Sequence, residues 1–251
     1  MTAWLVLDAI RDGKISWSTP CKVPAHVRKI PNIKVGYLPN TFVSVYNLLL
    51  ALLVHSANDA AYVLAANTYG GEKNFIKRMN EKAQQIGMSN THFINPSGLP
   101  HRKQLSTAYD LALMIKHLLI EHPQHYSLFG QPTFIYQGKT YYNSNPFLHT
   151  HSEIDGVKTG FVSASSYNIA VTMNQGKQKL LAIVLGEPTI LARNDKVAHL
   201  LNIIKPRFSP KIRVVPCKGH PASKWSIQIG AFKNKLSARH FIKEVVDLTA
   251  K

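Results

Sequence analysis

Apolar residues recur at three- and four-residue spacing through the first half of the chain, a pattern typical of helices that pack on a core. Residues 72–86 show it most clearly, and Gly87 ends that segment. Ser44 and Ser106 stand where the N-caps of two helices are expected. The pattern predicts five helices, over residues 1–12, 45–54, 59–69, 72–86 and 107–121.

The pattern changes after Pro123, where short apolar segments alternate with turn residues. Gly138-Lys139 separates two of these segments and indicates a hairpin. Residues 180–185 are apolar on both faces of a strand, so we expect helices to cover both faces of their sheet. The predicted strands span residues 133–137, 140–143, 156–162, 167–173 and 179–185, and a further amphipathic helix spans residues 191–204.

The end of the chain has a different composition. Residues 206–222 are basic and rich in proline, which is typical of an extended connector. Residues 225–232 alternate as a strand, and residues 237–249 follow as a helix. We therefore expect a first domain over residues 1–205, a linker over 206–222 and a partial second unit over 223–251, because one strand and one helix cannot enclose a core.

Composition and charge narrow the class of protein only slightly. Hydrophobic residues make up 45% and charged residues 17%, which excludes a disordered chain. The net charge of +17 favours anionic partners such as nucleic acid, anionic lipid or a carboxylate-rich cell wall. An aromatic RNA-binding motif, zinc-ligand spacing and a basic helix are all missing from the sequence, so nucleic acid is not an expected partner.

The two cysteines, Cys21 and Cys217, fit neither a metal-ligand spacing nor a C-x-x-C motif. A disulfide between them and two separate thiols both remain open. No apolar run is long enough to span a membrane. Residues 1–10 lack the basic start and the small-residue cleavage site of a signal peptide.

Two triplets carry the candidate chemistry. Ser56-Ala57-Asn58 matches S-x-N, and Lys158-Thr159-Gly160 matches K-T-G about a hundred residues later. These are two of the three motifs of penicillin-binding, serine-acylating enzymes, and the third motif, S-x-x-K, supplies the nucleophile. No serine in the sequence has a lysine three residues later. The residues that hold a substrate are therefore present without the residue that attacks it.

The ordered set of motifs resembles the D-alanyl-D-alanine carboxypeptidases, which are low-molecular-mass penicillin-binding proteins of the serine beta-lactamase-like family. A beta-lactamase would share the three-motif logic, but residues 91–100 and 106–112 favour a carboxypeptidase. The resemblance implies an α/β (α+β) fold, with an antiparallel sheet flanked by helices and a helical subdomain. It implies no cofactor and no metal. The implied partners are peptidoglycan pentapeptide stems, and beta-lactams where the nucleophile segment is restored.

By this resemblance, Ser56, Asn58 and Lys158 are the catalytic residues present. The family's serine attacks the carbonyl between two D-alanines, and water then hydrolyses the acyl-enzyme. Ser56 would relay a proton to the leaving amine, and Asn58 would bind the substrate backbone and orient the lysine. Lys158 would lower the proton affinity of the site and attract the substrate carboxylate. Ser56 and Lys158 are thus expected to face one cleft.

The substrate-binding residues implied by the resemblance are Lys158, Thr159, Gly160 and Phe161. Thr159 would offer its hydroxyl to the substrate carboxylate, and Gly160 would let the substrate backbone lie against the strand. The amide of Phe161 would be one oxyanion-hole donor. Phe161 stands where the family commonly has histidine, and this puts contacts to the substrate carboxylate in question.

In this family a methionine-threonine pair commonly follows the S-x-x-K lysine, so Met1-Thr2 aligns directly after it. We therefore expect the N-terminal part of the domain to be missing from this chain, and a full-length protein to act in the periplasm or cell envelope. Residues 223–251 resemble the opening of a SPOR domain, whose family binds peptidoglycan glycan strands.

Simpler interpretations stay open at this point. Ser56 alone would serve as a cap for the helix from Asp59, and Lys158 alone would be a solvated strand lysine. The histidines His55, His92, His101 and His117 form no ligand spacing and fit surface or helix-packing positions. The alternative function is a non-catalytic peptidoglycan-binding protein that keeps the site without its nucleophile.

Overall fold

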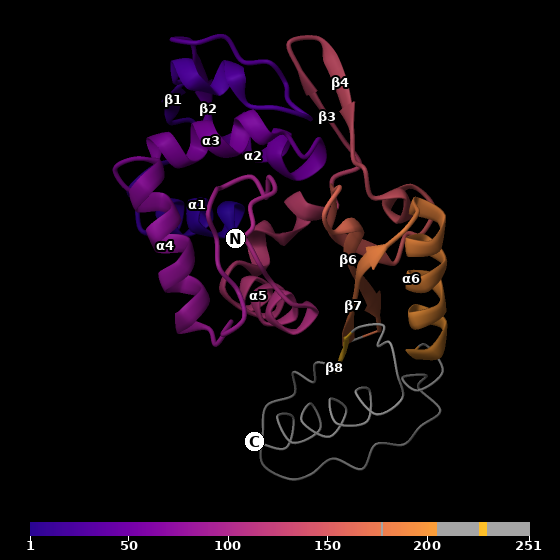
Figure 1. Ribbon diagram of the computed structural model, residues 1–251. Coiled ribbons are helices and arrows are strands. Elements are labelled where there is room, and N and C mark those ends of the chain that lie inside the picture. The colour runs from indigo at the N-terminus through magenta and orange to yellow at the C-terminus, as the bar shows by residue number, and fades with distance from the viewer. Residues whose placement is uncertain (177, 205–225, 230–251) are drawn as a thin grey trace.

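The computed structural model describes residues 1–176, 178–204 and 226–229 (Figure 1). Within these ranges, no helix combines the length and the apolarity needed to cross a bilayer. The predicted linker at 206–222 and the predicted helix at 237–249 lie outside the described residues, as do Cys217 and most of the SPOR-like segment. The sequence-based expectation of a mixed fold, with an antiparallel sheet flanked by helices, is confirmed.

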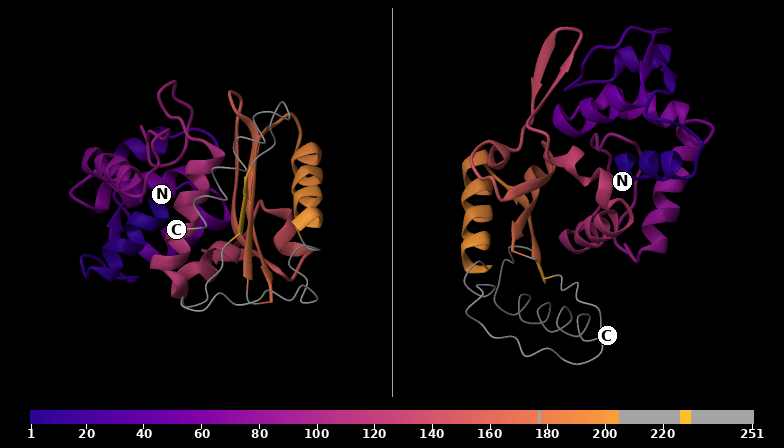
Figure 2. Two further views of the ribbon diagram at one scale, coloured as in Figure 1. Left: turned by 90° about the horizontal axis from the view of Figure 1, so that it is seen from below. Right: turned by 180° about the vertical axis from the view of Figure 1, so that it is seen from behind.

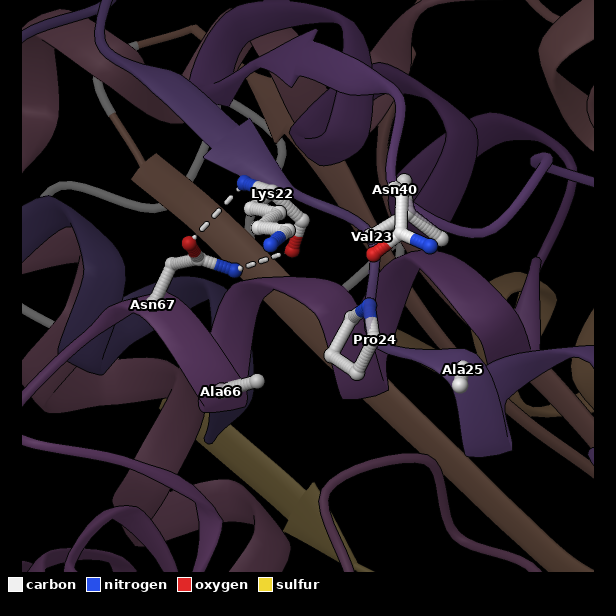
Figure 3. A pocket seen from close by; sticks show the side chains of 7 residues that line it. All are labelled: Lys22, Val23, Pro24, Ala25, Asn40, Ala66 and Asn67. Carbon is white, nitrogen blue, oxygen red and sulfur yellow. Dashed lines mark hydrogen bonds between the residues drawn. The ribbon is translucent and has the colours of Figure 1, made fainter.

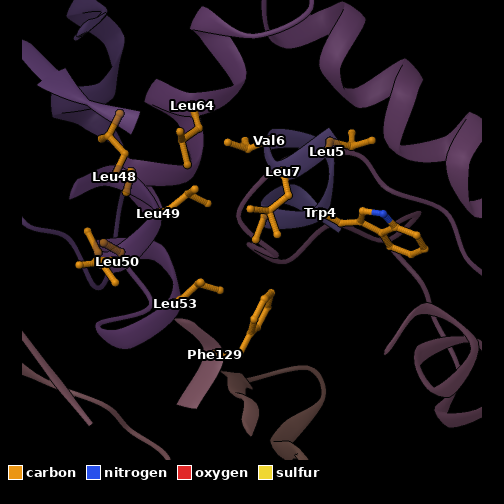
Figure 4. Packing of buried hydrophobic residues seen from close by; sticks show 14 of the residues in the cluster. Trp4, Leu5, Val6, Leu7, Leu48, Leu49, Leu50, Leu53, Leu64 and Phe129 are labelled. Carbon is orange, nitrogen blue, oxygen red and sulfur yellow. The ribbon is translucent and has the colours of Figure 1, made fainter. Parts of the chain in front are cut away.

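All five helices of the first half are present close to their predicted bounds. Helix α1 is almost wholly buried, as expected of a segment that is apolar nearly all round. Figure 4 shows its Leu7 packed toward Leu49 and Leu53 of α2, with Phe129 close by. The helices are α1 (Thr2–Arg11), α2 (Val45–Val54), α3 (Asn58–Asn67), α4 (Glu72–Gln85) and α5 (Ala108–Glu121).

Two short strands and a 3-10 turn lie between α1 and α2. Strand β1 (Pro20–Lys22) pairs antiparallel with β2 (Phe42–Ser44), and η1 (Ala25–Lys29) lies between them in the chain. Cys21 points into the core here, and burial raises its pKa to about 11. A thiol in this environment stays protonated and unreactive near neutral pH.

Two predicted details needed correction. The N-cap of α5 is Thr107 rather than Ser106, because the Thr107 hydroxyl accepts from the Asp110 amide at 3.1 Å. The Ser106 hydroxyl lies 2.9 Å from Thr91 instead. The hairpin is formed by β3 (Thr133–Tyr136) and β4 (Lys139–Tyr142), and its turn residues are Gln137 and Gly138, both at positive φ.

The main sheet has the order β5-β6-β7-β8. Strands β5 (Ile154–Val162), β6 (Ser166–Gln175) and β7 (Gln178–Glu187) form an antiparallel meander, which leaves β5 at one edge. Strand β8 (Ser226–Ile229) pairs in parallel with β7 at the other edge. The sequence predicted a strand at this position but not its place beside β7.

Helices cover both faces of this sheet, as the double-sided apolar run of β7 predicted. Leu181 and Ile183 belong to the larger core with α1, α2 and α5. Leu180 and Val184, one residue out of step, belong to a second core with α6 (Ile190–Ile204). Figure 2 shows the sheet nearly edge-on, with α6 on one side and the other helices opposite. Because successive side chains of β7 point to opposite faces of the sheet, they belong alternately to the two cores.

Candidate active site

The turn between α2 and α3 presents Ser56 in a strained conformation. His55 is the C-cap of α2, and Ser56 follows with φ of 62°, in the left-handed region that a residue with a Cβ rarely adopts. The Ala57 amide returns to the Ala51 carbonyl at 3.0 Å and closes the turn. Among the described residues no side chain caps α3, whose N-cap is Ala57. Ser56 is therefore not the cap of α3, and its strained backbone marks a position set by its surroundings.

The other residues of this triplet are tied to the loop at residues 31–37. The Asn58 amide donates to Ile33 O at 2.9 Å, and its side chain donates to Pro31 O at 3.2 Å. The neighbouring carboxylate of Asp59 is buried and accepts the backbone amide of Gly36 at 2.8 Å and that of Val35 at 3.2 Å. These bonds fix both the start of α3 and the loop that faces it.

Lys158 lies on the edge strand β5 and is half-buried. Its Nζ donates to Thr159 O at 3.2 Å. Burial lowers the pKa of Lys158 from its ordinary 10.5 to about 8. Within the described part of the chain no carboxylate forms an ion pair with it, and burial is the one cause of the shift. A shielded ammonium without a counter-ion favours an anion brought to it.

The next three residues give β5 one hydroxyl, one open backbone position and one exposed ring. The Thr159 hydroxyl lies 2.5 Å from Ser144 Oγ. A Cβ built on Gly160 would come no closer than 3.9 Å to another residue's atom, so space rather than collision surrounds it. Phe161 is 57% exposed, with its ring 4.5 Å from that of Tyr167. Its side chain therefore stands on the surface rather than in the core.

His55 directly precedes the S-x-N triplet and packs against the β3–β4 hairpin. Its ring lies 4.7 Å from the ring of Tyr141 on β4, in an edge-to-face arrangement. Burial lowers the pKa of His55, and the positive charges of Lys139 and Lys158 lower it further. The charge of Lys158 thus acts on the residue directly before Ser56, which is consistent with the expectation that the two triplets share a site.

Several polar groups anchor the start of β5 and so position Lys158. Thr172 and Asn174 on β6 each donate to Asp155 at 2.8 Å, and Lys179 on β7 forms an ion pair with the same carboxylate. A Cβ at Gly130 would lie 2.5 Å from the Asp155 carbonyl, so only glycine permits this approach. The strand is thereby held to its neighbours before the K-T-G triplet begins.

Sequence reasoning missed three contributors to this site. His55 was grouped with surface histidines, and neither Tyr141 nor Ser144 belongs to a recognised motif. Their positions depend on side-chain contacts of Tyr141 with His55 and of Ser144 with Thr159, which join segments that lie far apart in the sequence. The position of His55 directly before the S-x-N triplet was the one available signal.

A cavity of about 420 Å³ lies elsewhere, between β1 and the end of α3 (Figure 3). Asn67 donates to Lys22 O at 2.9 Å and accepts the Lys22 amide at 3.0 Å, which joins the two elements. Pro24, Ala66 and Asn40 complete its walls. No residue of either triplet lines this cavity.

Asp8, Glu121 and His122 form one group with metal-ligand spacing among the described residues. However, the Lys82 ammonium lies 3.2 Å from Asp8 and 2.9 Å from Glu121, and Arg11 also pairs with both carboxylates, so they already have cationic partners. His122 Nε2 lies 2.8 Å from Asp8. The donor set therefore suits an internal ion-pair cluster better than a metal ion.

The sheet is covered by helices on both faces, with Lys-Thr-Gly on its edge strand β5 and Ser-Ala-Asn in the turn between α2 and α3, and this is the fold of the penicillin-binding proteins. Penicillin-binding protein 5 from Haemophilus influenzae superposes with a TM-score of 0.76 at 30% identity, over 80% of this chain and 60% of that one. Penicillin-binding protein D2 from Listeria monocytogenes, in its cefotaxime-bound form, gives 0.71 at 31% identity, over 80% and 83%.

Residues 1–189 match the D-alanyl-D-alanine carboxypeptidase family. The chain belongs to that family. It is 28% identical to D-alanyl-D-alanine carboxypeptidase DacF of Bacillus subtilis over 252 aligned residues, which cover 97% of this chain and 61% of the relative. The chain thus spans about three-fifths of the length of this relative and of the Haemophilus protein.

Proposed function

We propose that this site binds the D-alanyl-D-alanine end of peptidoglycan pentapeptide stems. The observation that carries the proposal is the shielded ammonium of Lys158, which has no carboxylate partner in the described chain and a pKa lowered to about 8. A peptide's C-terminal carboxylate would supply the missing negative charge. The adjacent Thr159 hydroxyl, 2.5 Å from Ser144, would donate a hydrogen bond to the same group.

In this proposal the substrate backbone lies along β5, which is an edge of the main sheet. The open position of Gly160 supports a close approach. The Phe161 amide would be an oxyanion-hole donor, with its exposed side chain left to contact the substrate or solvent. Ser56 and Asn58 would serve the leaving amine and the substrate backbone on the opposite side.

Hydrolysis of the peptide needs a nucleophile that residues 1–251 do not supply, because no serine is followed three residues later by lysine. We propose that a longer form of the protein carries the S-x-x-K segment ahead of Met1. That form would act as a serine-type carboxypeptidase in the periplasm or cell envelope and would bind beta-lactams. The DNA directly upstream of the Met1 codon tests this: an in-frame S-x-x-K supports it, and a stop codon without one contradicts it.

Two measurements on the chain as printed test the site itself. Calorimetric titration with an N-acetylated L-Lys-D-Ala-D-Ala tripeptide should show binding that its C-terminal amide lacks. Incubation with a fluorescent penicillin followed by denaturation should leave no labelled band. Equal binding of acid and amide contradicts the carboxylate site, whereas a labelled band shows that another serine acts as nucleophile.

A second candidate function concerns residues 223–251. We propose that this segment contributes a SPOR-like contact to glycan strands, which would also suit a non-catalytic wall-binding protein. The W-x-I-Q-I-G-A-F pattern at residues 225–232 and the basic stretch before it support the proposal. Co-sedimentation with glycan strands stripped of peptide tests it, by comparison of the full chain with a chain that ends at residue 222. Equal sedimentation of both would contradict this role.

A further inference from the structure

His55 is held at the meeting point of three segments that surround the Ser56 turn. Its backbone ends α2, and its imidazole donates a hydrogen bond to the Lys34 carbonyl in the loop that binds Asn58 and Asp59. The other contact is the edge-to-face packing on Tyr141 of β4. A ring with this set of contacts controls where the turn lies relative to the hairpin.

The charges around His55 are mostly positive. Lys139 on β4 and Lys158 on β5 both act against its protonation, while Asp59 on α3 acts in its favour. Lys139 also lies over the Tyr141 ring, 5.0 Å from its centroid. Asp59 is committed to the backbone amides of the 35–37 loop, so its charge is already partly neutralised. The imidazole is therefore a half-buried base in a mostly positive field, and Lys158 is likewise a base whose pKa burial lowers.

We propose that His55 is a proton-dependent positioning residue for a ligand carboxylate at this site. Neutral His55 holds the Ser56 turn against Tyr141 and Lys34. When a carboxylate binds beside Lys158, its negative charge stabilises the imidazolium form of His55. His55 then takes up a proton from solvent and becomes a third positive group at the site, besides Lys139 and Lys158. The inference rests on the proposed function and deepens it, because it assigns a group that selects ligands with a free C-terminal carboxylate.

The sign of the coupling follows from linkage. The pKa of His55 in the free protein is lowered, by burial first and then by Lys139. An anion at the site raises that pKa, so ligand binding takes up a proton in the interval between the two values. Affinity is then highest below the free-state pKa and falls as the pH rises through the ligand-bound pKa. A difference of one pKa unit corresponds to roughly a tenfold change in affinity.

The test uses the whole chain and the N-acetylated L-Lys-D-Ala-D-Ala tripeptide. NMR titration of the histidine ring signals, with and without saturating tripeptide, should show an upward shift of the His55 pKa. The C-terminal amide of the same peptide should produce no shift. Calorimetry between pH 5 and 7.5 should show affinity falling roughly three- to tenfold over the same interval.

His55→Gln keeps an amide donor for the Lys34 carbonyl but cannot titrate, so it should bind the tripeptide with no pH dependence below 7.5. His117→Gln is the matched control. His117 also has a pKa lowered by burial and stacks on an aromatic ring, Trp4, but the strongest charge acting on it is that of Glu121, on the same helix. That variant should retain the wild-type pH profile.

The outcomes separate the two proposals. Binding with an unshifted His55 resonance, or an unchanged pH profile in His55→Gln, overturns the role of His55 and leaves the proposed function intact. Absence of tripeptide binding at every pH overturns both. If His55→Gln does not fold, the NMR titration of the unaltered chain still decides the question.

Discussion

Lys82 and Lys158 are both partly buried, but their surroundings differ. Lys82 on α4 lies between the carboxylates of Asp8 and Glu121, and its ammonium is 4.4 Å from the centre of the Trp4 ring. Lys158 on β5 has only the backbone carbonyl of Thr159 as a partner in the described chain. The first lysine joins three helices, whereas the second forms no ion pair with any residue that the structure describes.

The contrast indicates how a charged group in a protein interior can be interpreted. A charge surrounded by its counter-ions is part of the structure, and removal of one member leaves the others uncompensated. A charge without counter-ions reduces stability and persists where a ligand provides the compensation. On this basis we interpret the α1–α4–α5 cluster as structural and propose that the β5 lysine is functional. The following predictions test that distinction.

Lys82→Met should produce the largest effect. Asp8 and Glu121 would lose the ammonium between them, so the free energy of unfolding should fall by about 3–5 kcal/mol. Urea denaturation at pH 7 measures this. Lys77→Met on the same helix is the control, because Lys77 is exposed and lies 3.7 Å from Glu81, a surface pair worth under ~1 kcal/mol. Similar losses in both variants would show that the cluster is not structural.

Lys158→Met should have the opposite effect on stability and should weaken ligand binding. Affinity for the tripeptide should fall at least about tenfold, because a charge-assisted contact to the carboxylate is worth roughly 1.5–3 kcal/mol. Stability at pH 7 should rise by about 1–3 kcal/mol, since the desolvation that lowers the pKa to about 8 is removed. Lys22→Met, at an exposed strand lysine, should change neither quantity. A destabilised Lys158→Met chain would place this lysine in the structural class.

Alkaline pH should change stability and ligand affinity in opposite directions. The folded-state pKa of Lys158 is about 8, below its ordinary 10.5, so between these values the unfolded chain binds more protons. The Lys158 contribution to the free energy of unfolding therefore rises from pH 8 to 10.5, while affinity for the carboxylate falls. The difference between the wild type and Lys158→Met, followed by denaturation and calorimetry, isolates both trends. Parallel trends would contradict the assignment.

Ser56→Gly should give the smallest change: the free energy of unfolding should rise, whereas the affinity for the tripeptide should fall. Relief of the left-handed backbone should raise the free energy of unfolding by about 1 kcal/mol, and loss of the hydroxyl should weaken tripeptide binding. Ser166→Gly is matched in residue type and conformation, with φ of 56° at the β5–β6 turn. It should show the same gain in stability with unaltered affinity. Weaker binding in both variants would remove Ser56 from the site.

Local pattern was enough to predict most elements of the fold. Helical spacing located α4 within one residue at its end, and the double-sided apolar run in β7 predicted helices on both faces. The N-cap of α5 was predicted one residue early because Ser106 and Thr107 are both good caps, and only the geometry of the Thr91 contact separates them. The two triplets were identified through their motifs.

Contacts across long sequence separations were beyond this reasoning. Lys82, Asp8 and Glu121 come from three helices and look like ordinary surface charges in the sequence. Likewise, the lack of a counter-ion for Lys158 among the described residues is visible only once the neighbours of β5 are placed. Charge compensation is a property of the assembled interior, so a linear pattern cannot report it.

The hydrogen bond between Asp8 and His122 also bears on the order of folding. These residues are 114 positions apart, and Trp4 is 117 positions from its partner Glu121. Closing so long a loop carries an entropic cost that grows with the logarithm of its length. We therefore expect the α1 helix to dock after α4 and α5 have formed, and its ion pairs to belong to the late stages of assembly. Lys82→Met should consequently speed unfolding while the folding rate stays nearly unchanged.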